Sequence, residues 1–193
     1  MSTTGQGKGW DVLDSQDRAR FEQLVLPHLD AAFNLSRWLL RSRSDAEDVV
    51  QDACLRAFRA IGSFAGVNAR AWVLTIVRNT AYSWLRKSRN KMLVAIDDLD
   101  VEERGQAERG GDVASLNAIT PESELIARVN EARLEAAISA LPIEFREALV
   151  LRDMQGLEYR EIAEVTGMPV GTVMSRLARA RHRLIEAIRT DEP

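Results

Sequence analysis

Four acidic residues fall within eight positions of the N-terminal half: Asp45, Glu47, Asp48 and Asp52. Clustered carboxylates could bind a divalent cation, but these lie at a predicted helix start and share no face with a neutral ligand. Acids in a first turn stabilise a helix through its dipole, and an acidic helix face also suits docking to a basic partner. We favour a docking surface, keep helix stabilisation as the alternative, and predict no metal site.

No other residues form a recognisable catalytic group. The two histidines, His28 and His182, lie in no metalloprotease-type motif, and no glycine-rich phosphate loop is present. We therefore predict no catalytic residue, no cofactor and no enzymatic activity. The lone Cys54 cannot form an intramolecular disulfide and reads as a small buried residue. Since no long apolar run or signal peptide is evident, we predict a cytoplasmic protein without a membrane span.

Basic and aromatic side chains alternate in the middle of the chain. Residues 55–91 hold eight Lys or Arg and no acid, and Trp72, Tyr82 and Trp84 lie among them. Rings beside cations suit unpaired bases, which stack on the rings while the cations hold phosphates. The alternative is that the aromatic residues are core residues beneath a solvated basic rim. For the patch as a whole we favour nucleic acid.

A second basic surface is predicted near the C-terminus. A short helix over 159–165 is followed by Thr166-Gly167-Met168-Pro169, where Gly suits a helix end and Pro cannot continue one. A helix from Val170 then carries four arginines opposite an apolar face. A short helix, a glycine turn and a basic helix are typical of a helix-turn-helix, which places its second helix in the DNA major groove. An ordinary helical hairpin is the alternative.

The overall charge hides this pattern. The chain has 193 residues, is 46% hydrophobic and 28% charged, and carries a formal charge of −3. Residues 97–112 contain seven acids and two arginines, so the net value averages an acidic segment with the basic patches. The local patch is what a phosphate backbone would meet.

Helical spacing of apolar residues predicts an all-α protein of two small helical domains joined by a flexible linker, the second with the helix-turn-helix. We expect helices over 16–41 with a break at Pro27, from the N-cap Ser44 to Ile61, over 69–91, from Pro121 after the N-cap Thr120, and over 143–154. The predicted organisation is a flexible tail (1–15), a first domain (16–91), an acidic linker (92–120) and a second domain (121–190).

Three stretches together resemble a known family: DAEDVVQDACLRAFRAIGSF, ARAWVLTIVRNTAYSWLR and LPIEFREALVLRDMQGLEYREIAEVTGMPVGTVMSRLARARHRL. In this order the chain resembles a bacterial sigma factor of the extracytoplasmic-function (ECF) class, the minimal sigma-70 type with only conserved regions 2 and 4. The resemblance implies that the first domain is region 2, which binds core RNA polymerase, recognises the −10 element and melts it. It implies that the second domain is region 4, which binds the −35 element.

The resemblance also implies roles for single residues. The polymerase-binding set would be Asp45, Glu47, Asp48, Gln51, Asp52 and Leu55. The −10 set would be Phe64, Arg70, Trp72, Arg78, Asn79 and Arg86, with a pocket for a flipped base at Phe64 and Asn79. The −35 set would be Thr172, Ser175, Arg176, Arg179 and Arg183. Family members often carry Arg where Met174 stands, so base contacts there are expected to be fewer or apolar.

The implied partners are core RNA polymerase, through the clamp helices of its largest subunit and its flap, promoter DNA, and an anti-sigma factor. The linker would thread the polymerase towards its active centre. The runner-up is a helix-turn-helix transcription regulator that is not a polymerase subunit, with 16–91 as a dimerisation or sensing domain. It predicts tight duplex binding without polymerase. A helical enzyme or a pure protein-interaction module is a further alternative.

Overall fold

The computed structural model describes residues 15–96 and 121–190, with side chains described for 16–90 and 130–189. The described elements are helical. The predicted tail, most of the linker and the Thr120 cap lie outside the described residues. The N-terminal unit comprises α1 (Ser15–Leu24), the short 3-10 turn η1 (Leu26–His28), α2 (Leu29–Leu40), α3 (Arg43–Ala60), η2 (Ile61–Ser63) and α4 (Ala69–Ile96). The C-terminal unit comprises α5 (Pro121–Ala140), α6 (Ile143–Leu149), η3 (Val150–Met154), α7 (Tyr159–Thr166) and α8 (Val170–Thr190).

The predicted break at Pro27 is confirmed, because Pro27 lies in the turn η1 between α1 and α2. Two other boundaries were predicted wrongly. Ser42, not Ser44, caps α3: its backbone is extended and its hydroxyl accepts from the Asp45 amide. The linker was expected from Met92, but α4 continues to Ile96, since 92–96 contain no helix breaker and the acids start at Asp97.

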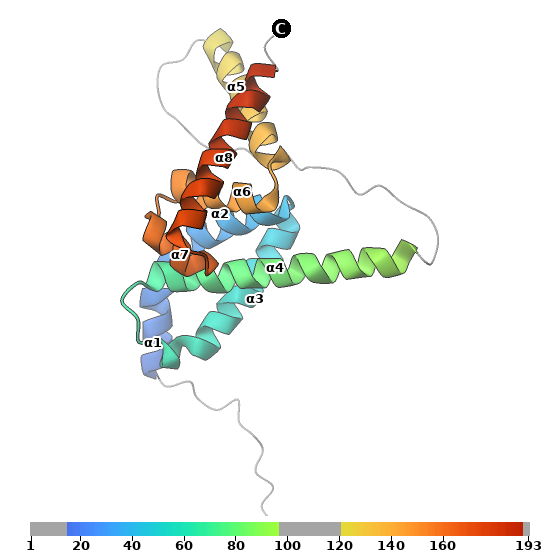
Figure 1. Cartoon of the computed structure of the whole chain (residues 1–193). Helices are drawn as coiled ribbons and strands as arrows, with labels where there is room; N and C mark the ends of the chain where they lie inside the picture. The colour runs from blue at the N-terminus through green and yellow to red at the C-terminus, as the bar shows by residue number, and fades with distance from the viewer. Residues whose placement is uncertain (1–14, 97–120, 191–193) are drawn as a thin grey trace, which may run out of the picture.

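The helix α4 is the axis around which the molecule packs. It crosses beneath the C-terminal unit and its end projects past the packed body (Figure 1). On one side it contacts α2 and α3, and on the other α7. Its buried residues Leu74, Val77 and Ala81 lie in a core that also includes Ile162 and Val173 of the C-terminal unit. The two units therefore share one apolar core across α4.

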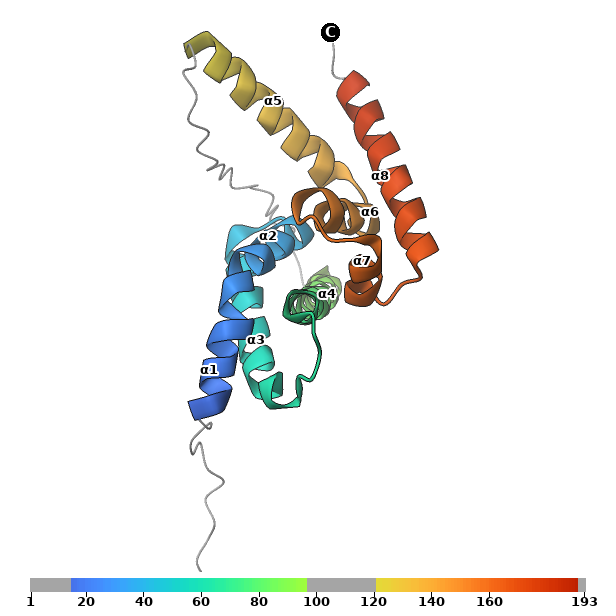
Figure 2. The same ribbon diagram turned by 90° about the vertical axis from the view of Figure 1, so that its left-hand side faces the viewer.

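The C-terminal unit opens away from this shared core. Seen at right angles to the first view, α5 and α8 diverge above α6 (Figure 2). A smaller cluster holds the base of this divergence together, formed by Ile138, Leu141, Leu149 and Ala180. Trp38 of α2 packs against both clusters and so ties the N-terminal unit to this base.

One turn of π-helix lies at the centre of the C-terminal unit. The amide of Gln155 donates to the carbonyl of Val150, five residues earlier. This wide turn replaces the end of the predicted 143–154 helix. Residues 146–151 are all buried, which no exposed amphipathic helix would allow, because α6 lies between α2 and α8.

Candidate nucleic-acid interface

The acidic helix α3 presents one continuous exposed face. Asp48, Gln51, Asp52 and Leu55 are three and four residues apart and all exposed, so they lie on one side of the helix. Leu55 is 56% exposed, a large apolar side chain surrounded by polar ones. Such a face suits a protein partner with an apolar contact and a basic rim.

Three acids of the polymerase-binding set are paired or partly covered within α3. Glu47 pairs with Arg43 at 3.2 Å, and Asp52 pairs with Arg56 at 2.9 Å. Asp45 is half-buried in the first turn. These exposed i,i+4 pairs contribute little to stability, so the acids remain available to a partner. No cluster that could hold a metal ion occurs among the described residues.

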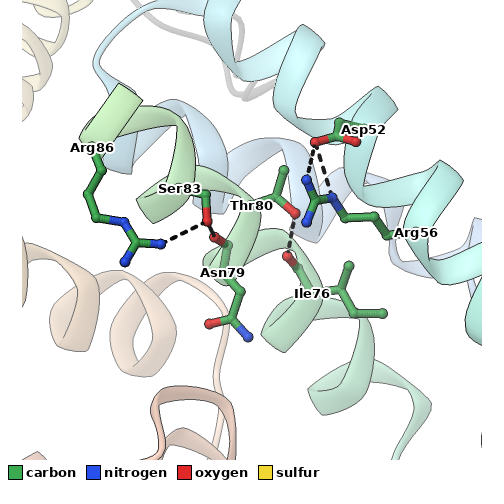
Figure 3. A network of polar contacts seen from close by, with 7 residues as sticks. All are labelled: Asp52, Arg56, Ile76, Asn79, Thr80, Ser83 and Arg86. Atoms are coloured by element: carbon green, nitrogen blue, oxygen red, sulfur yellow. Dashed lines mark hydrogen bonds and ion pairs between the residues drawn. The ribbon is translucent and has the colours of Figure 1, made fainter. Parts of the chain in front are cut away.

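The −10 set divides into an exposed group and an engaged group along α4. Figure 3 shows Asn79, Ser83 and Arg86 following one another along this helix, with the Asp52–Arg56 pair on the neighbouring α3. Arg86 donates to the Ser83 hydroxyl at 3.2 Å, and that hydroxyl donates to the Asn79 carbonyl at 2.8 Å. The Asn79 side chain is exposed, and its oxygen accepts a long hydrogen bond from Arg78 Nη1 at 3.5 Å, so its NH₂ group faces outward for a base edge or phosphate.

The loop before α4 forms a hollow. The Phe64 and Trp72 rings lie 4.7 Å apart, and Gly66 approaches so closely that a Cβ there would meet the Phe64 ring at 2.9 Å. A hollow of about 340 Å³ is lined by Gly66, Val67, Asn68, Ala71, Trp72, Thr75 and Glu164. Asn79 does not line it. The structure therefore brings Phe64 next to Trp72, but Phe64 does not line the hollow either, so the expected pocket between Phe64 and Asn79 is not formed here.

Arg78 and Arg70, by contrast, point towards the C-terminal unit. The Arg78 guanidinium donates to the Glu147 carboxylate, with Nε–Oε1 at 2.7 Å and Nη2–Oε2 at 3.3 Å. Arg70 donates to the main-chain and side-chain oxygens of Gln155. These two cations of the −10 set are thus already hydrogen-bonded to the C-terminal unit.

Glu147 is a residue that the sequence analysis missed. It is 0% exposed, and its position in α6 gives no local signal, because its partner Arg78 lies 69 residues away. Burial raises the pKa of the Glu147 carboxyl, and the hydrogen bonds and charge of Arg78 oppose that rise. Burial, with the nearby Glu147, raises the pKa of Tyr82 to about 12. The Arg78 guanidinium also lies 4.6 Å from the centre of the Tyr82 ring.

The neighbouring Arg146 also faces the N-terminal unit. It is 4% exposed, donates to the Ser139 carbonyl at 2.7 Å and approaches the Leu39 carbonyl at 3.5 Å, near the end of α2. Burial, and then the charge of Arg41, lower the pKa of Arg146 to about 10, so it stays charged at neutral pH. A cation at a helix C-terminus is favourable, so Arg146 helps seat α6 on α2.

The helix-turn-helix is built as predicted. Gly167 adopts φ +68, the left-handed conformation that ends α7. Glu158 and Glu161 form a reciprocal capping box at the start of α7. In α8, Val173, Leu177 and Ala180 are buried. The basic face is therefore held at a fixed rotation about the helix axis.

The members of the −35 set differ in exposure. Ser175, Arg179 and Arg183 are exposed, whereas Thr172 and Arg176 are half-buried. Arg183 lies over the Phe145 ring at 5.1 Å, and the Ser175 hydroxyl donates to the Thr172 carbonyl at 2.9 Å. Met174, at 51% exposure, lies on the open side of the helix beside Ser175. Arg179 is thus the cation of this set most open to a phosphate backbone.

Comparison with known proteins identifies this architecture. The Sigma-70 region 2 model matches residues 24–91, and the Sigma-70 region 4 model matches residues 131–184. The RNA polymerase sigma-H factor of Pseudomonas aeruginosa is 34% identical over 89% of this chain and 88% of its own length. The chain belongs to the ECF sigma factors of the sigma-70 family. This family is non-enzymatic, which confirms that the chain is not an enzyme.

A second relative and two solved structures are also similar to this chain. The sigma-E factor of Haemophilus influenzae is 35% identical over 87% of both chains. Among solved structures, the sigma factor RpoE of Bartonella quintana, in complex with the anti-sigma factor NepR, shares 31% identity at a TM-score of 0.68, over 89% of this chain and 98% of that one. CnrH, in complex with the cytosolic domain of CnrY, shares 26% identity at a TM-score of 0.62 over 91% of both chains. The N-terminal unit of this sigma factor is therefore region 2 and the C-terminal unit region 4.

This sigma factor has no helix, among its described residues, that is long and apolar enough to cross a membrane. Cys54 is a free, half-buried thiol whose pKa is raised by burial. Its surroundings therefore favour the neutral, unreactive thiol.

Proposed function

We propose that this ECF sigma factor binds core RNA polymerase through the exposed face of α3. The observation that carries the proposal is the isolated apolar side chain of Leu55 within the polar face of Asp48, Gln51 and Asp52. An apolar contact enclosed by charged residues is typical of a specific protein interface. The partner surface would be the basic clamp helices of the largest subunit, and the polymerase flap would hold region 4. The protein would then act in the cytoplasm, with the polymerase.

The −10 set would read the promoter strand as it opens. Asn79 and Arg86 are exposed on α4, the helix that packs against α3. DNA held here would therefore lie beside the docked polymerase. Trp72, on the region 2 side of the hollow, offers an aromatic wall to an unstacked base, and capture of that base offsets the few kcal/mol that unstacking costs.

The helix α8 would bind the −35 element as duplex. Its basic face presents Arg179 to the backbone, with Ser175 and Met174 beside it. A methionine at this position favours an apolar contact, for instance to a thymine methyl group. The N-terminus of α8 follows the left-handed Gly167, as in helix-turn-helix proteins that enter the major groove with this end.

We also propose that an anti-sigma factor controls this sigma factor. Of the solved structures to which it is similar, one holds the sigma factor RpoE with the anti-sigma factor NepR, and another holds CnrH with the cytosolic domain of CnrY. The support is the similarity over about nine-tenths of the chain, which includes both regions. Such a partner would cover surfaces that the polymerase needs.

One reconstitution tests the central proposal. The purified full-length protein is added to core RNA polymerase with genomic DNA, and the transcripts are sequenced. Specific start sites that share an upstream motif are expected with the protein and not without it. Tight sequence-specific duplex binding by the free protein, together with no specific initiation, would favour the plain helix-turn-helix regulator.

A further inference from the structure

Two neighbouring charged residues of α6 are buried where the two units meet. Arg146 is 4% exposed and Glu147 0% exposed, although charged side chains are rarely buried without a partner. Each of these two residues also bonds to a residue of the N-terminal unit. Glu147 bonds with Arg78 of α4, and Arg146 reaches the end of α2. Within an isolated region 4 the Glu147 carboxylate would lack its partner Arg78, so its role lies between the units.

The ion pair between Glu147 and Arg78 is suited to a contact that forms and separates. Burying two charges costs desolvation, which their mutual attraction offsets only in part, so such a pair adds specificity more than net stability. When the units separate, both groups regain water. The apolar contacts between the units give adhesion, while this pair fixes which face of α4 region 4 covers.

The covered face belongs to the −10 set. Arg78 is a cation of the −10 set and so would contact a DNA phosphate, but its Nε and Nη2 both donate to Glu147. Carboxylate and phosphate bind the guanidinium fork in the same two-point geometry, so one excludes the other. Two further bonds cover neighbouring positions: Arg70 donates to Gln155, and Asn68 donates to Glu161 at 2.7 Å.

We propose that Glu147 is a built-in competitor for DNA, which occupies the phosphate site of Arg78 while region 4 is packed on region 2. This inference rests on the proposed role of the −10 set in DNA binding. Promoter DNA reaches Arg78 only after region 4 moves away and takes the carboxylate with it. Binding to polymerase, which holds the two regions on separate sites, is what separates them. The free sigma factor therefore binds single-stranded DNA weakly at Arg78.

The test is the full-length variant Glu147→Gln, which keeps the size of the side chain and removes its charge. A labelled single-stranded DNA of random sequence is the probe, because a phosphate contact is independent of sequence. At low salt we expect E147Q to bind this probe about tenfold more tightly than wild type, since a charge-assisted competitor has been removed. Small-angle X-ray scattering should show a larger radius of gyration for E147Q than for wild type, because the contact between the units has lost its ion pair.

Two further variants sharpen the result. E131Q makes the same change at an exposed glutamate of α5 in the same unit and should leave DNA affinity unchanged. R78Q combined with E147Q should lose the gain. Should E147Q fail to fold by circular dichroism, N68D serves in its place, with scattering as its readout. An aspartate can still cap α4 at the Ala71 amide, but it faces the Glu161 carboxylate and should push the units apart.

The proposal is wrong if folded E147Q gains no affinity for DNA, if E131Q gains as much, or if the gain survives without Arg78. It is also wrong if N68D, where it replaces E147Q, leaves the radius of gyration unchanged. Transcription with core polymerase separates this from the proposed function. Specific initiation by both wild type and E147Q, without the gain in DNA affinity, overturns only the competitor role. Absence of specific initiation with either protein overturns the proposed function itself.

Discussion

The Asn68 side-chain amide donates to Glu161 Oε1 at 2.7 Å and so links the start of α4 in region 2 to the start of α7 in region 4. The same Asn68 accepts from the Ala71 amide at 3.0 Å, and the same Glu161 accepts from the Glu158 amide at 2.8 Å. Each of the two residues therefore caps its own helix and also bonds to the other residue. The Asn68–Glu161 pair thus stabilises both helix ends and the contact between the two units.

Glu161 should make the stability of the chain depend on pH in the acidic range. The Glu158 amide, and secondarily Asn68, lower the pKa of the Glu161 carboxyl below its ordinary 4.5. A group with a lowered pKa stabilises the fold above that ordinary value and loses its contribution as pH falls through the folded value. We expect Glu161→Gln to cost about 1 kcal/mol at neutral pH, as for loss of a cap. In urea unfolding this difference from wild type should shrink below pH 4.5. The exposed Glu164 on the same helix is the control, and an equal cost at every pH would contradict the assignment.

Tyr82 should report whether the two units are packed. Burial and Glu147 raise the pKa of the Tyr82 phenol to about 12. The neutral phenol therefore stabilises the fold at lower pH, and this contribution is lost as pH rises through that value. In a Tyr159→Phe background Tyr82 is the sole tyrosine. Its phenolate absorbance should show half-titration near pH 12. Adding Glu147→Gln should move it towards the ordinary value of about 10. Titration of the parent at that ordinary value would show that Tyr82 is exposed in solution.

Local sequence signals were enough for the helix-turn-helix and not for the contact between the units. Gly167 favours the left-handed conformation that ends a helix and Pro169 cannot continue one, so the position of the turn could be predicted from the sequence. Two serines lie near the start of α3, and the local sequence favoured Ser44, with a glutamate three residues on, over the true cap Ser42. The burial of Glu147 has no periodic signature at all. It depends on Arg78 in another unit, so it could be found only once the units were placed together.

Gly167 and Gly171 should respond to alanine with opposite signs. Gly167 has φ +68 and no neighbour within 4 Å of an added Cβ, so Gly167→Ala is penalised only by its left-handed backbone, at about 1 kcal/mol. Gly171 lies inside α8 with equally open space, so Gly171→Ala should stabilise by about 0.5–1 kcal/mol. Denaturant midpoints measure both. A lower stability of Gly171→Ala than of wild type would mean that a neighbouring group occupies the space around Gly171.

Leu55 should matter to polymerase binding and not to folding. It is 56% exposed, so Leu55→Asp should change the free energy of unfolding by no more than about 0.5 kcal/mol. Affinity for core polymerase should fall at least about tenfold, as for an apolar anchor at an interface centre. Val67→Asp is the matched control, since Val67 is fully exposed in the loop before α4 and lies off this face. Equal losses for the two variants would point to a general charge effect instead.

Met174 should be the position at which duplex binding can be strengthened. It is 51% exposed on the face of α8 that carries Ser175 and Arg179, so Met174→Arg would add a cation directed at the DNA. One added phosphate contact should steepen the slope of log affinity against log salt by about 0.9 in holoenzyme–promoter complexes. Met154→Arg adds the same charge at a methionine of similar exposure, 44%, in η3 instead of α8. The slope should steepen for the α8 variant and stay unchanged for the η3 variant, because only a cation that touches the backbone releases counterions. Equal slopes for both variants would mean that α8 does not lie in the groove.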